Sequence, residues 1–128
     1  HFIPAQPKER MSSFLAAADV CIAILKDIPM FRTTYPNKVF DYMASGRPTV
    51  LAIDGVIREV VEKAEGGVFV QPGSPGALAE AVLIYHQDID LRLRHGRNSR
   101  SYVAASFDRQ QQALRLKATL EKVYSYRR

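Results

Sequence analysis

The chain has 128 residues, and its pattern is set by a short apolar run, VCIAIL, at residues 20–25. The run is continuous and partly β-branched, which is typical of a strand buried on both faces of a sheet. Two similar runs follow, TVLAI at residues 49–53 and VFV at residues 68–70. Apolar residues at helical spacing separate the three runs. This alternation predicts an α/β, Rossmann-like protein with a parallel sheet and helices on both faces.

The signals that begin and end helices support this pattern. Pro36 suits a first helical position, and Gly46 ends the same segment. Ser74 is expected as an N-cap before Pro75, whereas residues 26–35 are polar and irregular and predict a loop. Helices are expected at residues 8–18, 36–45, 56–64, 75–85, 89–105 and 109–126. The sequence therefore predicts a single domain over residues 1–128, with a C-terminal helical segment at 107–126.

Composition limits the class of protein. Apolar residues make up 47% and charged residues 24%, which favours a packed domain, and no apolar run approaches the ~20 residues of a membrane span. The single cysteine, Cys21, excludes a disulfide framework and fits a reducing, cytoplasmic location; we expect it to be a buried small hydrophobe. Three scattered histidines predict no metal site. Because the chain opens at His1, we expect it to be part of a longer protein.

The net charge of +5 is unevenly distributed. Residues 86–128 hold ten Lys and Arg against four Asp and Glu, a net of +6, whereas residues 1–85 have a net of −1. A basic segment of this kind suits an anionic membrane surface or an acidic partner domain. The arginines fall on more than one helical face without interleaved aromatics, so we expect no nucleic-acid partner. His86 and His95 lie in this segment and are expected to be solvated.

The candidate site follows from the expected sheet. Ligands of such folds bind beyond the carboxyl ends of the strands, here in the loops at 26–35, 54–55 and 71–75. The segment TTYPNKVFDYM at residues 33–43 joins one strand end to a helix N-terminus. Its first turn holds Lys38, although the positive end of the helix dipole favours acids. A bound phosphate or diphosphate would accept the free N–H groups and pair with Lys38.

Two simpler interpretations remain open for this segment. Lys38 could be solvated and paired with Asp41, three residues further along the helix. Asp41 could in turn be an ordinary solvated helix residue. Behind a phosphate site, however, its carboxylate would accept hydrogen bonds from vicinal hydroxyls, as acids do for ribose in nucleotide folds.

Taken together, the motifs resemble the donor-binding half of GT-B glycosyltransferases of family 4 (glycosyl transferases group 1). The resemblance covers nearly the whole chain and is carried by residues 18–20, 35–50, 67–75, 78–81 and 96–103, and by Phe107. It implies the C-terminal, nucleotide-sugar-binding domain of a retaining, metal-independent hexosyltransferase that uses a UDP- or GDP-linked donor and no cofactor. It further implies a role in polysaccharide or glycolipid synthesis.

The resemblance also implies roles for individual residues. Asp41 matches the acid that holds the donor ribose. Tyr35, Pro36, Asn37 and Lys38 match the turn and helix start that meet the diphosphate, and Thr33 and Thr34 match the loop on the sugar side. Ile3 and Pro4 match the segment beside the base. The expected partners are the nucleotide sugar, an N-terminal acceptor domain missing from this chain, and the inner membrane face as a peripheral contact.

The chain departs from the family pattern in two ways. The family often carries two glutamates eight positions apart, but here the second is Asp41 and the first is Thr33, so the acid that touches the donor sugar is absent. The acceptor domain and the domain's first strands are also missing, so the chain alone is expected to be inactive. The alternatives are a sugar-nucleotide 2-epimerase of GT-B fold and a non-catalytic nucleotide-binding or structural domain.

Overall fold

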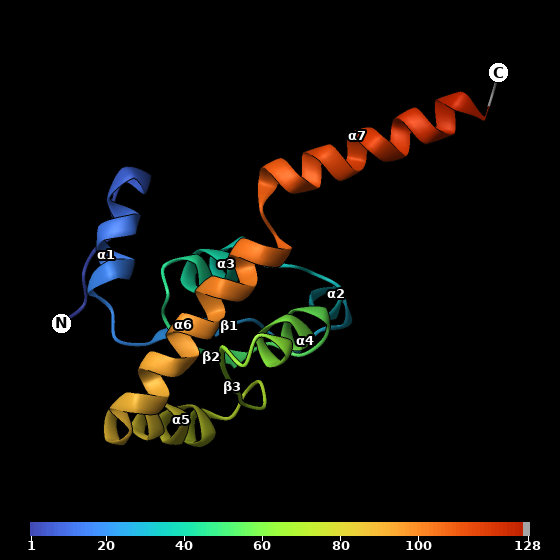
Figure 1. Cartoon of the computed structure of the whole chain (residues 1–128). Helices are drawn as coiled ribbons and strands as arrows, with labels where there is room; N and C mark the ends of the chain where they lie inside the picture. The colour runs from blue at the N-terminus through green and yellow to red at the C-terminus, as the bar shows by residue number, and fades with distance from the viewer. Residues whose placement is uncertain (127–128) are drawn as a thin grey trace.

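The computed structural model describes residues 1–126 as an α/β domain with two helices set apart from its body (Figure 1). The sheet is parallel, in the order β1-β2-β3, and consists of β1 (Cys21–Ile24), β2 (Thr49–Ala52) and β3 (Gly67–Phe69). The helical elements are η1 (Lys8–Arg10), α1 (Met11–Ala17), α2 (Pro29–Arg32), α3 (Asn37–Ala44), α4 (Val56–Lys63), α5 (Pro75–Gln87), α6 (Ile89–Ser106) and α7 (Arg109–Ser125). The predicted fold class is confirmed.

Two apolar clusters, one on each face of the sheet, hold the domain together. On one face Leu51 and Ala23 pack with the inward side chains of α3 and α4, including Met43 and Ile57. On the other face Val50 and Ala52 pack against α5, where Ala81 and Tyr85 are buried. Strands covered by helices on both sides bury nearly every side chain, and all four residues of β2 are buried.

The prediction that the first strand is buried on both faces is wrong. Cys21 and Ala23 are buried, but Ile22 is 40% exposed and Ile24 is 51% exposed. Both isoleucines lie on the face that α5 covers over β2, and β1 is at the edge of the sheet. The register places Ile22 beside Val50 and Ile24 beside Ala52, so the apolar surface of this face continues past the helix that covers it.

Helix α6 crosses the amino ends of the strands. Ser99 donates a 2.9 Å hydrogen bond to the carbonyl of Gly66, and Asn98 donates one of 3.2 Å to the carbonyl of Glu65. Gly96 packs against the backbone of Gly46, which follows the C-cap of α3. The motif at residues 96–103 therefore closes the end of the sheet opposite the expected ligand site.

Two local predictions need correction. Residues 26–35 contain a short helix, α2, because Pro29 supplies a suitable first residue and Phe31 N–H bonds the carbonyl of Ile28. Pro36 is the N-cap residue of α3, with Asn37 as its first helical residue. By contrast, Ser74 caps α5 as expected and accepts a hydrogen bond from Ala77 N–H at 3.4 Å.

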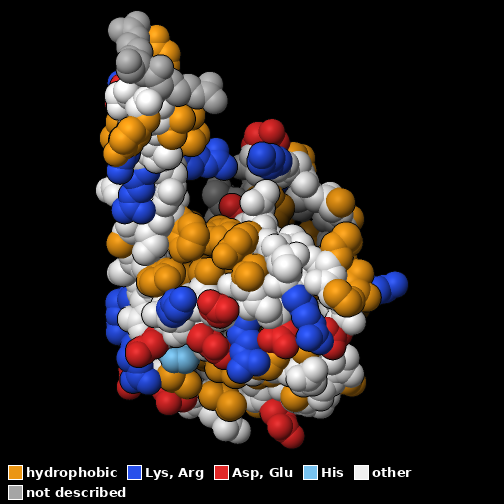
Figure 2. Space-filling model, turned by 90° about the vertical axis from the view of Figure 1, so that its right-hand side faces the viewer, with side chains coloured by type: hydrophobic (Ala, Val, Ile, Leu, Met, Phe, Trp, Pro, Cys, Tyr) orange, Lys and Arg blue, Asp and Glu red, His pale blue; other side chains and the backbone are white. Residues whose placement is uncertain are grey.

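Helix α7 projects away from the domain after Phe107 (Figure 1). None of its residues is buried, and Leu116 and Leu120 are each 61% exposed. Figure 2 shows α7 extending from the body, with hydrophobic side chains gathered on the adjacent face. Within residues 1–126, no helix is long and apolar enough to cross a bilayer.

His95 is half-buried, which corrects the prediction that it is solvated. Its Nδ1 lies 2.8 Å from the hydroxyl of Tyr85, whose ring is completely buried. Burial lowers the pKa of His95, and the positive charge of Arg94 lowers it further. The folded state therefore favours the neutral imidazole that can accept the tyrosine proton.

This pair predicts an acid-sensitive contribution to stability. The unfolded chain holds His95 at its usual pKa of about 6.5 and binds more protons there, so the contribution is present above that pH and is lost as the pH falls below it. Urea denaturation of the wild type and of His95→Gln at about pH 7.5 and about pH 5.5 measures it. The difference in unfolding free energy between the two proteins is expected to shrink at the lower pH. An equal difference at both pH values contradicts the prediction.

Candidate functional site

The carboxyl ends of the three strands bring together two of the loops expected at the site. Residues Lys26, Asp27 and Phe31 lie opposite Pro72 and Gly73 across a hollow of about 670 Å³. Gly55, in the third loop, has φ +98°, and a Cβ there would be 2.0 Å from the carbonyl oxygen of Arg32. Only glycine fits this close approach between the turn after β2 and the end of α2.

Charged side chains at this edge of the sheet pair with one another. Arg32 bonds Asp27 at 3.0 Å, and Arg58 bonds Asp54 at 3.4 Å and Glu62 at 2.7 Å. The N–H of Gly55 bonds Asp54, and this bond, with Arg58 beside it, lowers the pKa of that carboxyl. These side chains already have partners, so we assign them a structural role.

The N-terminus of α3 is open in the way the sequence predicts. It has no side-chain cap and no acid in its first turn. The N–H groups of Asn37 and Lys38 therefore have no acceptor within the helix. Lys38 Nζ lies 3.2 Å from the carbonyl oxygen of Ile24, at the end of β1. The simpler interpretation, in which Lys38 pairs with Asp41, is wrong: no salt bridge joins these two described residues.

Lys38 and Asp41 line the same cavity, a space of about 540 Å³ between α1 and α3. Asp41 is exposed, and its carboxylate has no hydrogen bond or ion pair within residues 1–126. The floor of the cavity includes Tyr42, where burial raises the pKa of the hydroxyl. A space of this size suits a small organic ligand.

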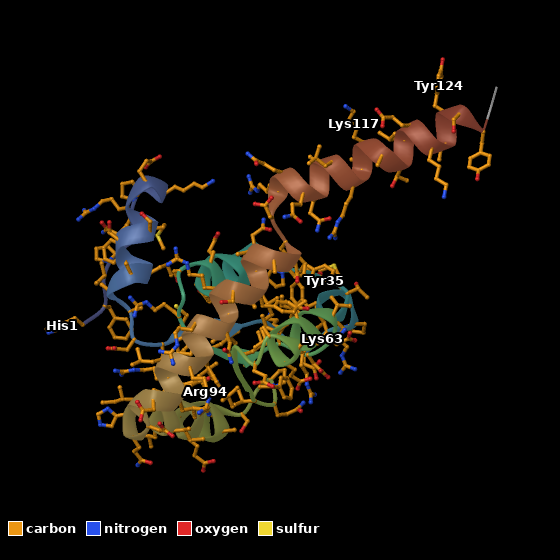
Figure 3. All side chains as sticks on the ribbon, in the orientation of Figure 1. His1, Tyr35, Lys63, Arg94, Lys117 and Tyr124 are labelled. Carbon is orange, nitrogen blue, oxygen red and sulfur yellow. The ribbon has the colours of Figure 1, made fainter. Side chains whose placement is uncertain are left out.

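The other residues expected at the diphosphate and the sugar lie outside that cavity. The ring of Tyr35 is 52% exposed and sits 6.3 Å from the ring of Phe40, at the side of the domain seen in Figure 3. The hydroxyls of Thr33 and Thr34 both donate to the carbonyl of Met30, at 3.2 and 2.9 Å. Both threonines therefore close the end of α2.

Ile3 and Pro4 precede η1 and are exposed, and neither lines the cavity. The wall opposite Asp41 comes instead from Lys8, Met11, Ser12, Leu15 and Ala16. The sequence indicates this segment only as an amphipathic helix, because its polar residues match no binding motif. The contribution of this wall becomes visible only when α1 is placed beside α3.

Arg47 fixes the position of α1. Its guanidinium Nη2 donates to the carbonyl of Ala16, in the last turn of α1. Arg92 also bonds Asp19, just after α1, at 3.3 Å.

Cys21 is 5% exposed, and burial raises the pKa of its thiol to about 11. This confirms Cys21 as a buried small residue and leaves it without a role in the site.

Fold and cavity together define an α/β domain with an open helix N-terminus, a lysine and a free carboxylate facing a ligand-sized space. The family model for glycosyl transferases group 1 matches residues 1–88, so the chain belongs to this family. The matched residues include both walls of the cavity, whereas α6 and α7 lie beyond them.

Two solved structures share the fold. Sucrose-phosphate synthase from Thermosynechococcus elongatus is 24% identical with a TM-score of 0.81, over 98% of this chain and 30% of its own. HepE from Anabaena, solved in complex with UDP, is 21% identical with a TM-score of 0.72, over 85% of this chain and 29% of its own. The chain therefore spans less than a third of the length of either. A search of curated proteins gives no significant match.

Proposed function

We propose that this chain is the donor-binding domain of a glycosyltransferase and binds a nucleoside diphosphate sugar between α1 and α3. The observation that carries the proposal is that Lys38 and Asp41 share one cavity along α3, in a member of the group 1 family. The open helix start offers N–H groups to phosphate oxygens, and Asp41 offers acceptors to ribose hydroxyls. The donor is UDP- or GDP-linked, and the site requires neither a metal nor a further cofactor.

In the proposed transfer reaction, the α3 N-terminus and Lys38 act on the leaving group. The bond between the anomeric carbon and the diphosphate oxygen breaks, a bond from that carbon to the oxygen of an acceptor hydroxyl forms, and the hydroxyl proton passes to the departing diphosphate. Negative charge then grows on the leaving diphosphate, where the dipole of α3 and the Lys38 ammonium stabilise it. We assign the whole protein to retaining hexosyl transfer in polysaccharide or glycolipid synthesis, with the acceptor held by another domain. The isolated chain is then inactive.

A calorimetric titration of the protein with UDP and with GDP tests the proposal. Binding of at least one nucleotide, weakened when Lys38 or Asp41 is replaced by alanine, is the expected result. No binding, or binding that neither substitution changes, would refute it. With the full-length enzyme and a UDP-sugar, release of UDP only when an acceptor is present separates a transferase from a 2-epimerase.

We also propose that α7 meets a surface outside the domain. Leu116, Leu120 and Val123 form an exposed row along it, and its basic side chains outnumber its one acid, Glu121. Lys117 bonds Glu121 at 3.8 Å, and Figure 3 shows Lys117 extending from the projecting helix into solvent. Apolar and basic side chains on one helix suit an anionic membrane that carries a lipid-linked acceptor. An acceptor domain is the other partner expected from the sequence.

Vesicle sedimentation distinguishes these two partners. We expect the protein to sediment with phosphatidylglycerol vesicles, and the double substitution Leu116→Ser, Leu120→Ser to weaken this at least about tenfold, because two leucines lose their apolar contact. Leu83→Ser, at a comparably exposed position of α5, is the matched control and should change nothing. A wild-type protein that stays in the supernatant contradicts the membrane contact and leaves an acceptor domain as the expected partner of these three residues.

A further inference from the structure

The cavity between α1 and α3 has a second cationic side chain, Lys8, on the wall opposite Asp41. Lys8 belongs to η1 and is exposed, and its ammonium has no ion pair or hydrogen bond within residues 1–126. Its neighbour Arg10 differs: it bonds Gln6 at 3.0 Å and lies over the ring of Phe14 at 5.7 Å. Of the two basic residues of η1, only Lys8 lines the cavity.

Lys8 and Lys38 both lie far from the hydrogen bond that connects α1 to the end of α3. Arg47, just after α3, bonds the carbonyl of Ala16 and so holds the carboxyl ends of α1 and α3 together. Lys8 precedes α1 and Lys38 begins α3, so both lysines stand at the helix ends remote from this bond. Nearer that bond, the lining residues Ala16 and Ala44 are apolar, and the hydroxyl of Ser45 already donates to the carbonyl of Tyr42 at 2.7 Å.

The charged side chains that line the cavity do not pair with one another. No salt bridge joins Asp41 to Lys8 or Lys38, although all three face the same space. The Lys38 ammonium already donates one hydrogen bond to the carbonyl of Ile24, so only its other N–H groups are available to a ligand. A diphosphate carries more than one negative charge, so a single shared lysine leaves it poorly compensated, whereas a second ammonium from the facing wall completes the site.

We propose that Lys8 binds the diphosphate of the nucleotide from α1, so that the phosphate groups are held between Lys8 and Lys38. The inference rests on the proposed function and adds a binding residue that belongs to neither the turn nor the helix start assigned from the sequence. It also gives α1 a role: the helix closes the nucleotide site from the side opposite α3.

An NMR titration, which measures millimolar dissociation constants, tests this with UDP and with uridine as probes. Lys8→Ala is expected to weaken UDP binding by about tenfold, the value of one charge-assisted hydrogen bond, and to leave uridine binding within about twofold of the wild type. Lys8→Arg keeps the charge and should restore most of the affinity for UDP. Arg10→Ala, in the same short helix, is the matched control and should bind both probes like the wild type.

The outcomes separate this inference from the proposed function. If the wild type binds neither UDP nor GDP, the proposed function itself fails. If the wild type binds UDP and Lys8→Ala binds it equally well, Lys8 has no part in the site, although the function stands. If Lys8→Ala weakens UDP and uridine to the same extent, Lys8 acts on the nucleoside or on the position of α1, and the diphosphate assignment is overturned.

Discussion

Replacing Gly96 by alanine is expected to lower the free energy of unfolding by about 3 kcal/mol, the upper end of the usual cost of overpacking. A Cβ at this position would lie 2.3 Å from the carbonyl oxygen of Gly46 and 3.1 Å from its carbonyl carbon. Both atoms are backbone, so relief requires α6 to move away from α3. Such a movement would also stretch the bond between Ser99 and Gly66 on the next turn of α6.

Urea denaturation followed by circular dichroism measures this loss, and Gly76→Ala in α5 is the matched control. A Cβ at Gly76 would meet nothing within 4 Å, so the same substitution should be neutral or should stabilise by about 0.5 kcal/mol through reduced freedom of the unfolded chain. Equal unfolding free energies for the two variants would show that α6 is not held tightly against the end of α3.

In the proposed nucleotide site, replacing Lys38 by alanine is expected to weaken UDP binding by about tenfold to hundredfold. The substitution removes the ammonium but leaves the N–H groups of α3, so a residual affinity should remain. Lys38→Arg keeps the charge and should recover part of the loss. The dependence of binding on salt should also weaken, because one cation fewer faces the phosphates.

Asp41→Asn provides the complementary measurement because Asp41 is assigned to the ribose, whereas Lys38 is assigned to the diphosphate. The amide retains one acceptor oxygen but loses the charge, so the affinity should fall for UDP and for uridine alike, whereas Lys38→Ala should affect UDP alone. Lys63→Ala is the control: this lysine pairs with Glu59 on α4, outside the cavity, and should bind both probes normally. If Lys38→Ala and Asp41→Asn give the same profile, the assignment of diphosphate and ribose along α3 is wrong.

The sequence by itself predicted the order of the elements, because apolar periodicity and helix caps act locally. Thr49–Ala52 form a completely buried strand, Ser74 caps α5, and the helix after Pro36 ends at Ala44, two residues before Gly46. Lys38 stood out for the same reason: a cation in a helix's first turn opposes the dipole and needs no neighbour to be noticed. Local sequence signals were therefore enough to mark Lys38 and Asp41 as candidate binding residues.

Only the tertiary structure decided which surfaces these elements share. Ile22 and Ile24 are exposed because the covering helix α5 lies over β2 and β3, and no local pattern encodes that offset. The facing wall of the cavity, with Lys8, depends on a hydrogen bond between Arg47 and Ala16, residues 31 positions apart. The sequence thus determined the strands, the helices and one charged wall, whereas long-range packing determined the second wall and the edge that stays uncovered.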